Sequence, residues 1–420
     1  MTINKEYFNN INLPLLYKKY HGPVWVYEYE KIISQINKLR DFDIIRYAQK
    51  ACSNIHILRL MKSNKVKVDA VSIGEIERAL LAGFNPYINN NDIIFTADLL
   101  DEYTLKRIIE LNIPINVGSI NMLSQIGKHK SNYNIWLRIN PGFGYGHSKK
   151  TNTGGENSKH GIWHEELSEA ISCIKYFNLN LVGIHMHIGS GVNYNHLSKV
   201  CNEMIKHVVF CKKNILYISA GGGLSTPYTK EDTKINVNNY FNLWNNARNI
   251  ISDYLGYKVN LEIEPGRFLV AESGVLVSQV KAIKSNKNRH FILVDVGFND
   301  LIRPVMYGSY HHISLLPHDG RNLKNYELIN TVIGGPLCES GDIFTQSSYG
   351  DIITRLLPPA SIGDYIIFHD TGAYGSSMSS NYNSRPLLPE VLCINGKDYQ
   401  IRQRQTLKQL FDLELKCLSI

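Results

Sequence analysis

Short apolar runs rich in β-branched residues recur along residues 43–264 and alternate with longer segments of helical periodicity. The short runs predict buried strands, and the longer segments predict helices with one face on a core. Eight strand-like runs fall at 43–49, 67–72, 93–96, 115–118, 135–140, 181–187, 216–220 and 259–264. Helical patterns lie between them, at 54–64, 74–83, 97–111, 165–177, 196–212 and 239–255. Eight such units predict a parallel (β/α)8 barrel of TIM type.

The pattern changes after Pro265 to strands and turns without long helices, at 274–284, 290–296, 331–334, 364–368 and 399–404. This texture predicts an antiparallel β-sandwich or β-barrel domain. One isolated strand candidate, 23–27, precedes the barrel, and we expect it to join the second domain. The predicted division is therefore a barrel at 28–265 and a β domain made of 1–27 plus 266–420. The loop 141–160 is long enough for an active-site lid or an interface loop.

Composition narrows the class of protein. The 420 residues are 44% hydrophobic, and the net charge of +8 is spread along the chain. We therefore expect no nucleic-acid partner. The amino end lacks a signal-peptide pattern, and no apolar run approaches the roughly 20 residues that cross a bilayer, so we expect a cytoplasmic protein without a membrane partner. Seven cysteines without a C-x-x-C pair indicate neither a disulfide framework nor a zinc knuckle.

The predicted strand ends carry an informative set of side chains. Barrel enzymes place their chemistry at the carboxyl ends of the strands. Strand 1 ends in Lys50, strand 6 in His185 and His187, strand 7 in Gly221-Gly222-Gly223, and strand 8 in Glu264. A lysine at a strand end is by itself commonly a solvated residue. Next to the other three ends, it becomes a candidate for chemistry that needs an amine.

These groups together suggest pyridoxal 5′-phosphate bound as an imine. Lys50 would form the imine, and the three glycines would let backbone N–H groups approach a phosphate. Glu264 would pair with the pyridinium nitrogen and keep it protonated, which makes the ring a stronger electron sink. His187 would stack on the ring. For His185 we favour an ordinary hydrogen-bonded interior histidine.

A metal site is the rival interpretation of the two histidines. Residues two apart on a strand face the same side, so His185 and His187 could both ligate a metal, as in barrel hydrolases. Such a site needs further ligands. The sequence has neither a second H-x-H nor an aspartate at the end of strand 8. We therefore expect no metal.

Several motifs resemble a known family. "YAQKACSN", "HMHIGSG", "SAGGGLSTPY" and "EPGR" are similar to the fold-type III pyridoxal-phosphate decarboxylases. "GGPLCESGD" and "DTGAYGSSMSSNYNSRPLLPEVL" resemble, within that family, the diaminopimelate decarboxylases. The similarity runs from about residue 23 to residue 404. It implies a homodimer with shared active sites that makes L-lysine and CO2 from meso-2,6-diaminopimelate, the last step of lysine biosynthesis.

The resemblance also implies residue roles. Lys50 and Cys338 would be catalytic, together with His187. The implied cofactor-binding residues are Lys50, His187, Ser190, Gly221, Gly222, Gly223, Glu264, Pro265, Gly266, Arg267 and Tyr374. The implied substrate-binding residues are Arg267, Arg303, Tyr307, Glu339 and Tyr374. Cys338 and Glu339 would reach the site from the partner subunit.

Two chemical arguments accompany these roles. A thiol with a pKa near ~8.5, placed on the correct face, can deliver a proton to a carbanion, and flanking glycines and acids suggest that Cys338 lies on an exposed loop. The unreacting end of diaminopimelate is a zwitterion, so guanidinium groups for its carboxylate and an acid for its ammonium suit it. Two other kinds of protein remain as alternatives. One is another decarboxylase or racemase of this fold, and the other is a non-catalytic relative, in which Lys50 or Cys338 would be lost.

Overall fold

The computed structural model describes residues 11–86, 92–144, 153–187, 189, 193–211, 214–287 and 289–417. The chain forms two compact units. The first contains residues 1–34, 227–233 and 270–420, and the second contains 35–226 and 234–269. Helices α2 (Tyr29–Asn37) and α10 (Arg267–Val270) lie where the chain passes from one unit to the other.

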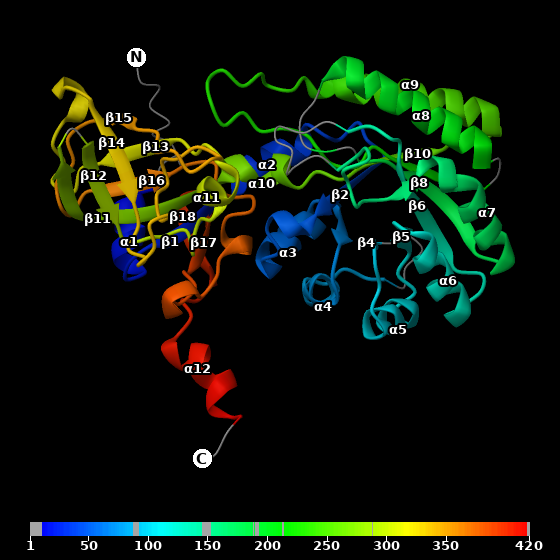
Figure 1. The fold of residues 1–420 in the computed structure, drawn as a ribbon, viewed down its shortest axis with the longest axis horizontal. Helices are drawn as coiled ribbons and strands as arrows, with labels where there is room; N and C mark the ends of the chain where they lie inside the picture. The colour runs from blue at the N-terminus through cyan, green and yellow to red at the C-terminus, as the bar shows by residue number, and fades with distance from the viewer. Residues whose placement is uncertain are drawn as a thin grey trace. The chain divides into compact units, whose positions relative to one another are not determined.

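The second unit is a closed parallel barrel (Figure 1). Its strands are β2 (Ile44–Ala48), β3 (Lys67–Ala70), β4 (Ile93–Ala97), β5 (Ile115–Val117), β6 (Asn134–Asn140), β8 (Asn180–His185), β9 (Tyr217–Ser219) and β10 (Asn260–Ile263). Each neighbouring pair is parallel, and pairing of β5 with β6 closes the ring. The two-residue strand β7 (Ile162–Trp163) adds to β6. The structure confirms the eight-stranded barrel that the apolar runs predict.

Helices alternate with these strands along the chain. They are α3 (Ile55–Ser63), α4 (Ile73–Leu81), α5 (Glu102–Glu110), α6 (Ile120–His129), α7 (Leu167–Tyr176), α8 (Tyr194–Cys211) and α9 (Val237–Leu255). Helix α6 is additional to the helices that the sequence pattern identified. Helix α5 begins five residues later than expected, because the Asp101 side chain accepts a hydrogen bond from the Thr104 amide (2.8 Å) and caps the helix there.

A buried ion pair joins two neighbouring strands of the barrel, β2 and β10. Arg46 on β2 donates to both carboxylate oxygens of Glu262 on β10, from Nε at 3.0 Å and from Nη2 at 2.9 Å. Both side chains are almost completely buried. This bidentate geometry satisfies both charges where water is excluded.

The first unit is built on a nine-stranded mixed sheet. Its strands are β1 (Val24–Glu28), β11 (Gly274–Asn286), β12 (Arg289–Val294), β13 (Ile313–Leu316), β14 (Ile329–Gly334), β15 (Arg355–Leu357), β16 (Tyr365–Phe368), β17 (Glu390–Ile394) and β18 (Lys397–Arg402). Its short helices are α1 (Leu13–Lys19), α11 (Arg303–Tyr307) and α12 (Leu407–Leu415). Most pairs are antiparallel as expected, but β1 with β17 and β12 with β14 are parallel.

The isolated amino-terminal strand takes a central place in this sheet. All five residues of β1 are buried, and the strand pairs with β11 on one side and with β17 on the other. Val24 and Val26 pack in one core with Val275, Val277 and Val391. The expectation that the segment 23–27 joins the β domain is confirmed.

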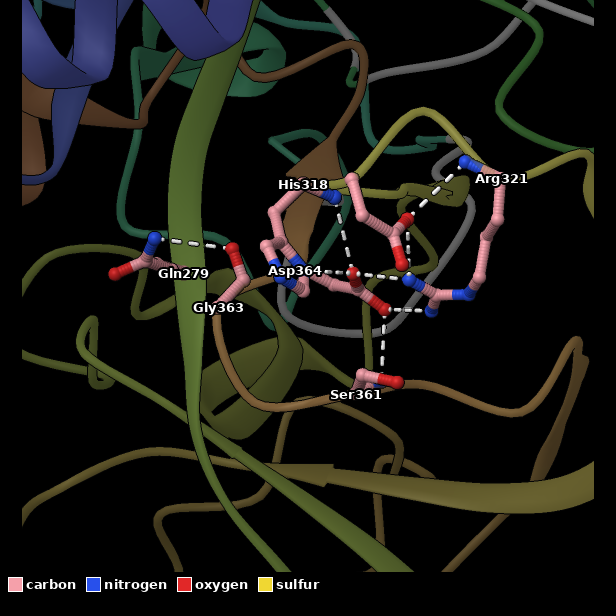
Figure 2. Close-up of polar contacts among 7 residues, drawn as sticks. Gln279, His318, Arg321, Ser361, Gly363 and Asp364 are labelled. Atoms are coloured by element: carbon pink, nitrogen blue, oxygen red, sulfur yellow. Dashed lines mark hydrogen bonds and ion pairs between the residues drawn. The ribbon is translucent and has the colours of Figure 1, made fainter.

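Asp364 joins the segment that follows β13 to the turn that leads into β16 (Figure 2). Its buried carboxylate accepts hydrogen bonds from the Ser361 amide (2.7 Å) and the His318 amide (3.0 Å), and it also binds Nδ1 of His318. The Arg321 guanidinium pairs with both of its oxygens and with Asp319. His318, Asp319 and Asp364 could ligate a metal by their spacing, but Arg321 already supplies the positive charge. We assign this cluster a structural role.

Candidate active site

Lys50 lies directly beyond the carboxyl end of the first barrel strand. Strand β2 ends at Ala48, and a single 3-10 turn, Gln49–Ala51, follows it. The Lys50 side chain is exposed, whereas Gln49 and Ala51 on either side are buried. The segment after β10 packs against this turn, because a Cβ on Gly266 would lie only 3.1 Å from the Ala48 carbonyl oxygen. The turn therefore presents the amine at the mouth of the barrel, next to the residues that follow Glu264.

The three glycines after β9 form a backbone turn that only glycine fits. Gly221 and Gly223 have φ angles of +63° and +104°. A Cβ on Gly221 would lie 2.7 Å from the Cβ of His187, and one on Gly222 would lie 2.8 Å from the Glu264 carbonyl oxygen. A Cβ on Gly223 would come within 2.3 Å of the Gly189 carbonyl oxygen. The close approach excludes side chains, so a phosphate could come near the backbone of Gly222 and Gly223, whereas the Gly221 amide already donates to the Ser219 hydroxyl at 3.1 Å.

Glu264 is a buried carboxylate with two hydrogen-bond donors. His185 Nε2 lies 2.7 Å from Oε2, and the Ser219 hydroxyl donates to Oε1 at 3.2 Å. Burial raises the pKa of Glu264, but the charge of His185, the hydrogen bond from His185 and the charge of Arg46 outweigh this effect and lower the pKa to about 2. The carboxylate is therefore ionised at any physiological pH. His185 is the hydrogen-bonded interior histidine that the sequence suggested, because its Nε2 is bonded to Glu264.

The pKa values of His187 and Asp69 are both shifted toward the uncharged form of the side chain. Burial lowers the pKa of His187 well below its usual range, and the charges of Arg138 and Lys50 lower it further. Its Nδ1 is buried without a hydrogen-bond partner among the described residues. Burial and the nearby charge of Glu264 raise the pKa of Asp69 well above its usual range. The surroundings at this end of the barrel therefore favour the ionised form of Glu264 and the uncharged forms of His187 and Asp69.

The long loop after β6 is anchored at the same end of the barrel. The side chain of Asn140 donates to the Gly155 carbonyl (3.1 Å) and accepts from the amides of Gly142 and Gly155. The Thr153 hydroxyl donates to the backbone carbonyl of His187 at 2.9 Å. These contacts hold both ends of the predicted lid segment 141–160, of which residues 145–152 lie outside the described part of the chain.

The remaining predicted site residues belong to the β unit, except Arg267, which is half-buried at the start of α10. Arg303 begins α11 and is 95% buried, while Tyr307 ends the same helix and is half-buried. Tyr374 follows β16 and has a φ of +57°. Such a backbone angle is uncommon for a residue with a side chain and clusters at functional sites.

Cys338 and Glu339 lie at the tip of an exposed turn, as the flanking glycines and acids suggested. Asp342 fixes this turn from within, because its carboxylate accepts hydrogen bonds from the amides of Leu337 and Phe298, both at 2.8 Å. The Cys338 amide donates to the Asn383 side chain at 3.1 Å. The thiol is therefore held on a rigid loop in contact with solvent.

The loop 297–301 connects these segments of the β unit. Phe298 donates to Asp342 below the cysteine turn, and its ring stacks on Tyr382 at 5.3 Å. The carbonyl groups of Asn299 and Asp300 accept hydrogen bonds from Ser380 (2.8 Å) and Ser379 (3.1 Å), on the segment that follows Tyr374. The same loop continues into α11 with Arg303. Cysteine turn, tyrosine loop and arginine helix are thereby fixed relative to one another.

The barrel residues suit pyridoxal 5′-phosphate. They provide an amine on Lys50, a glycine cradle that a Cβ would fill, an ionised acid on Glu264 and the face of the uncharged His187 ring. Sequence reasoning missed Asp69 and Arg138, although both lie on predicted barrel strands, where a charged residue in an apolar run is a usable signal. Ser190 lies outside the described residues. Among the described residues, no helix combines the length and apolar character that crossing a bilayer needs.

Comparison with known proteins agrees with this site. The family model of the pyridoxal-dependent decarboxylases, pyridoxal binding domain, matches residues 29–271. A diaminopimelate decarboxylase of Buchnera aphidicola from Schizaphis graminum is 60% identical over 410 residues, which is 98% of each chain. A crystal structure of diaminopimelate decarboxylase superimposes with a TM-score of 0.94 at 58% identity and covers 97% of both chains.

A more distant enzyme shares the fold in a liganded crystal structure. The diaminopimelate decarboxylase of Helicobacter pylori, complexed with L-lysine, gives a TM-score of 0.84 at 32% identity and covers 97% of this chain and 100% of its own. The family match extends over more than half of the chain, and the relatives extend over nearly all of it. The chain therefore belongs to the pyridoxal-dependent decarboxylases, within the group of the diaminopimelate decarboxylases, and uses pyridoxal 5′-phosphate as its cofactor.

Proposed function

We propose that this enzyme removes the carboxylate at the D-configured carbon of meso-2,6-diaminopimelate and releases CO2 and L-lysine. The observation that carries the proposal is the convergence of Lys50, the triglycine turn and an ionised Glu264 at one end of the barrel. Relatives of 55–60% identity that are named diaminopimelate decarboxylase support the choice of substrate.

We assign the cofactor to the barrel residues. Lys50 would hold it covalently, Ser190 and the turn of Gly221, Gly222 and Gly223 would bind its phosphate, and the ring of His187 would cover one face. When bound, the cofactor supplies an electron sink for the charge that remains at the α-carbon after CO2 leaves. Glu264 would stay ionised and hold a proton on the ring nitrogen, because its own pKa is held at about 2. Pro265, Gly266 and Arg267 would complete the binding segment.

Cys338 is the proposed proton donor to the substrate carbon. Support comes from its exposed position on a fixed turn, since a thiol there can meet a ligand, and five of the other six cysteines are buried or half-buried. We further propose a homodimer in which Cys338 and Glu339 complete the site of the partner subunit. All seven cysteines are thiols, which agrees with a protein of the cytoplasm.

The far end of the substrate is assigned to charged residues that match a zwitterion. Arg303, with Tyr307 and Arg267, would bind the carboxylate, and Glu339 would bind the ammonium group. Tyr374 would contact both phosphate and substrate. A substrate that has only an ammonium at that end would be repelled by the guanidinium groups, which argues against ornithine or lysine.

The direct experiment is incubation of the purified protein with pyridoxal 5′-phosphate and meso-diaminopimelate, followed by measurement of lysine and CO2. We expect stoichiometric release of both. Parallel incubations with L-lysine and L-ornithine test the alternative decarboxylases. Faster turnover of either amino acid than of meso-diaminopimelate would assign the enzyme to another substrate.

A further inference from the structure

Arg303 is held in a fixed direction by three uncharged acceptors. Its Nη1 donates to the Tyr228 hydroxyl at 3.0 Å and to His311 Nε2 at 3.1 Å, and its Nη2 donates to the Ser309 hydroxyl at 3.3 Å. The guanidinium carbon also lies 4.9 Å from the centre of the Tyr228 ring. These contacts orient the planar group and add no negative charge to it.

The role of His311 follows from its other nitrogen. Nδ1 lies 2.9 Å from the backbone carbonyl oxygen of His369, and a carbonyl oxygen can only accept. Nδ1 therefore carries the hydrogen, and in the neutral ring Nε2 presents its lone pair to Arg303. His369 is held in turn, because its Nε2 lies 2.7 Å from the Ser314 hydroxyl. The chain of contacts sets His311 as an acceptor for the arginine.

Tyr228 is fixed just as firmly. It lies in the segment 227–233, which packs with the β unit although the chain on both sides of it belongs to the barrel. The Asp232 carboxylate accepts hydrogen bonds from the amides of Tyr228 and Thr229, both at 2.8 Å, and closes this segment into a turn. The Tyr228 ring then packs edge-on against His311, with centres 5.5 Å apart. Tyrosine and histidine support each other and the arginine.

We propose that Tyr228 and His311 are positioning residues that aim the Arg303 guanidinium at the distal carboxylate of the substrate and so set the selectivity for a substrate with a carboxylate at both ends. This inference rests on the proposed function, in which Arg303 binds that carboxylate. A guanidinium that can rotate still attracts an anion, but it loses the bidentate geometry that distinguishes a carboxylate. Loss of either residue therefore affects binding of the distal carboxylate more than it affects turnover.

The experiment compares two ligands of the cofactor-loaded enzyme by calorimetry. L-lysine retains the distal carboxylate, and 1,5-diaminopentane lacks it. We expect Tyr228→Phe to weaken L-lysine about fivefold, as loss of one hydrogen bond does, and to change the affinity for diaminopentane less than twofold. The KM for meso-diaminopimelate should rise by a similar factor while kcat changes less. Tyr399→Phe, on the exposed strand β18, is the control for loss of a phenol.

Two substitutions of His311 separate positioning from simple packing. Asparagine can reproduce the donor to the His369 carbonyl, whereas glutamine can reproduce the acceptor toward Arg303. We expect His311→Gln to keep most of the preference for L-lysine over diaminopentane and His311→Asn to lose it. The opposite order would assign His311 to the support of His369 and would overturn the inference for this residue.

The outcomes also separate this inference from the proposed function. If wild-type protein makes no lysine, the proposed function fails. If it does, and Arg303→Gln leaves L-lysine binding unchanged, the assignment of Arg303 fails, and the inference fails with it. If Arg303→Gln weakens L-lysine but Tyr228→Phe and His311→Asn weaken both ligands equally or neither, the inference alone is wrong.

Discussion

Replacement of Glu264 by glutamine tests the electrostatic design of the barrel mouth. Glutamine keeps the size of the side chain and a carbonyl oxygen for His185, but it removes the negative charge. The pKa of Glu264 is lowered from 4.5 to about 2. At ~1.36 kcal/mol for each pKa unit, its surroundings favour the charged form by about 3 kcal/mol. The variant loses this charge entirely.

The expected effect on turnover follows from that magnitude. If the full free energy that favours the charged form of Glu264 also stabilises a proton on the cofactor nitrogen, loss of the charge would lower kcat by about 300-fold. Water at the barrel mouth reduces this effect, so we expect a decrease of between about 30-fold and about 300-fold. Glu264 is charged at every pH above about 2, so the decrease should be constant between pH 6 and pH 9.

The assay measures lysine formation after full loading with cofactor, which the absorption band of the lysine-bound cofactor verifies. Ser219→Ala serves as the matched control, because it removes the longer hydrogen bond to Oε1 and leaves the charge in place. It should cost less than about fivefold in kcat. A loaded Glu264→Gln enzyme with kcat within threefold of the wild type would refute the proposed role of the charge.

Three further outcomes are expected. Lys50→Ala should lose the visible band of the bound cofactor, and a retained band on spectrophotometric titration would place the covalent link elsewhere. Cys338→Ala should bind cofactor normally but turn over slowly, and mixing it with Lys50→Ala protein should restore activity if two subunits share each site; inactive mixtures with proven heterodimers would count against sharing. Asp364→Asn should destabilise the protein at pH 7 by about 2 kcal/mol in urea unfolding, since Arg321 and His318 help to lower the Asp364 pKa from 3.8 to about 2 against the effect of burial. A carboxyl whose pKa is lowered by folding stabilises the fold above its unfolded pKa, so the difference in stability between variant and wild type should shrink from pH 5 to pH 2. A difference in stability that does not depend on pH would contradict the argument.

The barrel fold and the position of the candidate site at the carboxyl ends of its strands could be predicted from the sequence alone. Apolar runs of β-branched residues and helical periodicity are local properties, so they place the eight barrel strands within a few residues, but not the two-residue strand β7. The rule that barrel enzymes act at the carboxyl ends of strands then brings together Lys50, Gly221–Gly223 and Glu264, although up to 214 positions separate them. The helices were less exact, because the start of α5 depends on the cap at Asp101 and α6 was missed.

The ionisation of the buried acids, the place of β1 in its sheet and the orientation of the Arg303 side chain depend on tertiary contacts. No local pattern shows that the pKa of Glu264 is lowered while that of Asp69 is raised, because the pKa of each depends on burial and on groups from other strands. The place of β1 between β11 and β17 is likewise set by pairing with residues about 250 to 365 positions away. Tyr228 lies 75 positions from Arg303, and its hydroxyl meets the guanidinium only because the segment 227–233 packs with the β unit. Neighbouring residues determine where a strand or helix forms, whereas residues distant in the sequence form the surroundings of a buried charge.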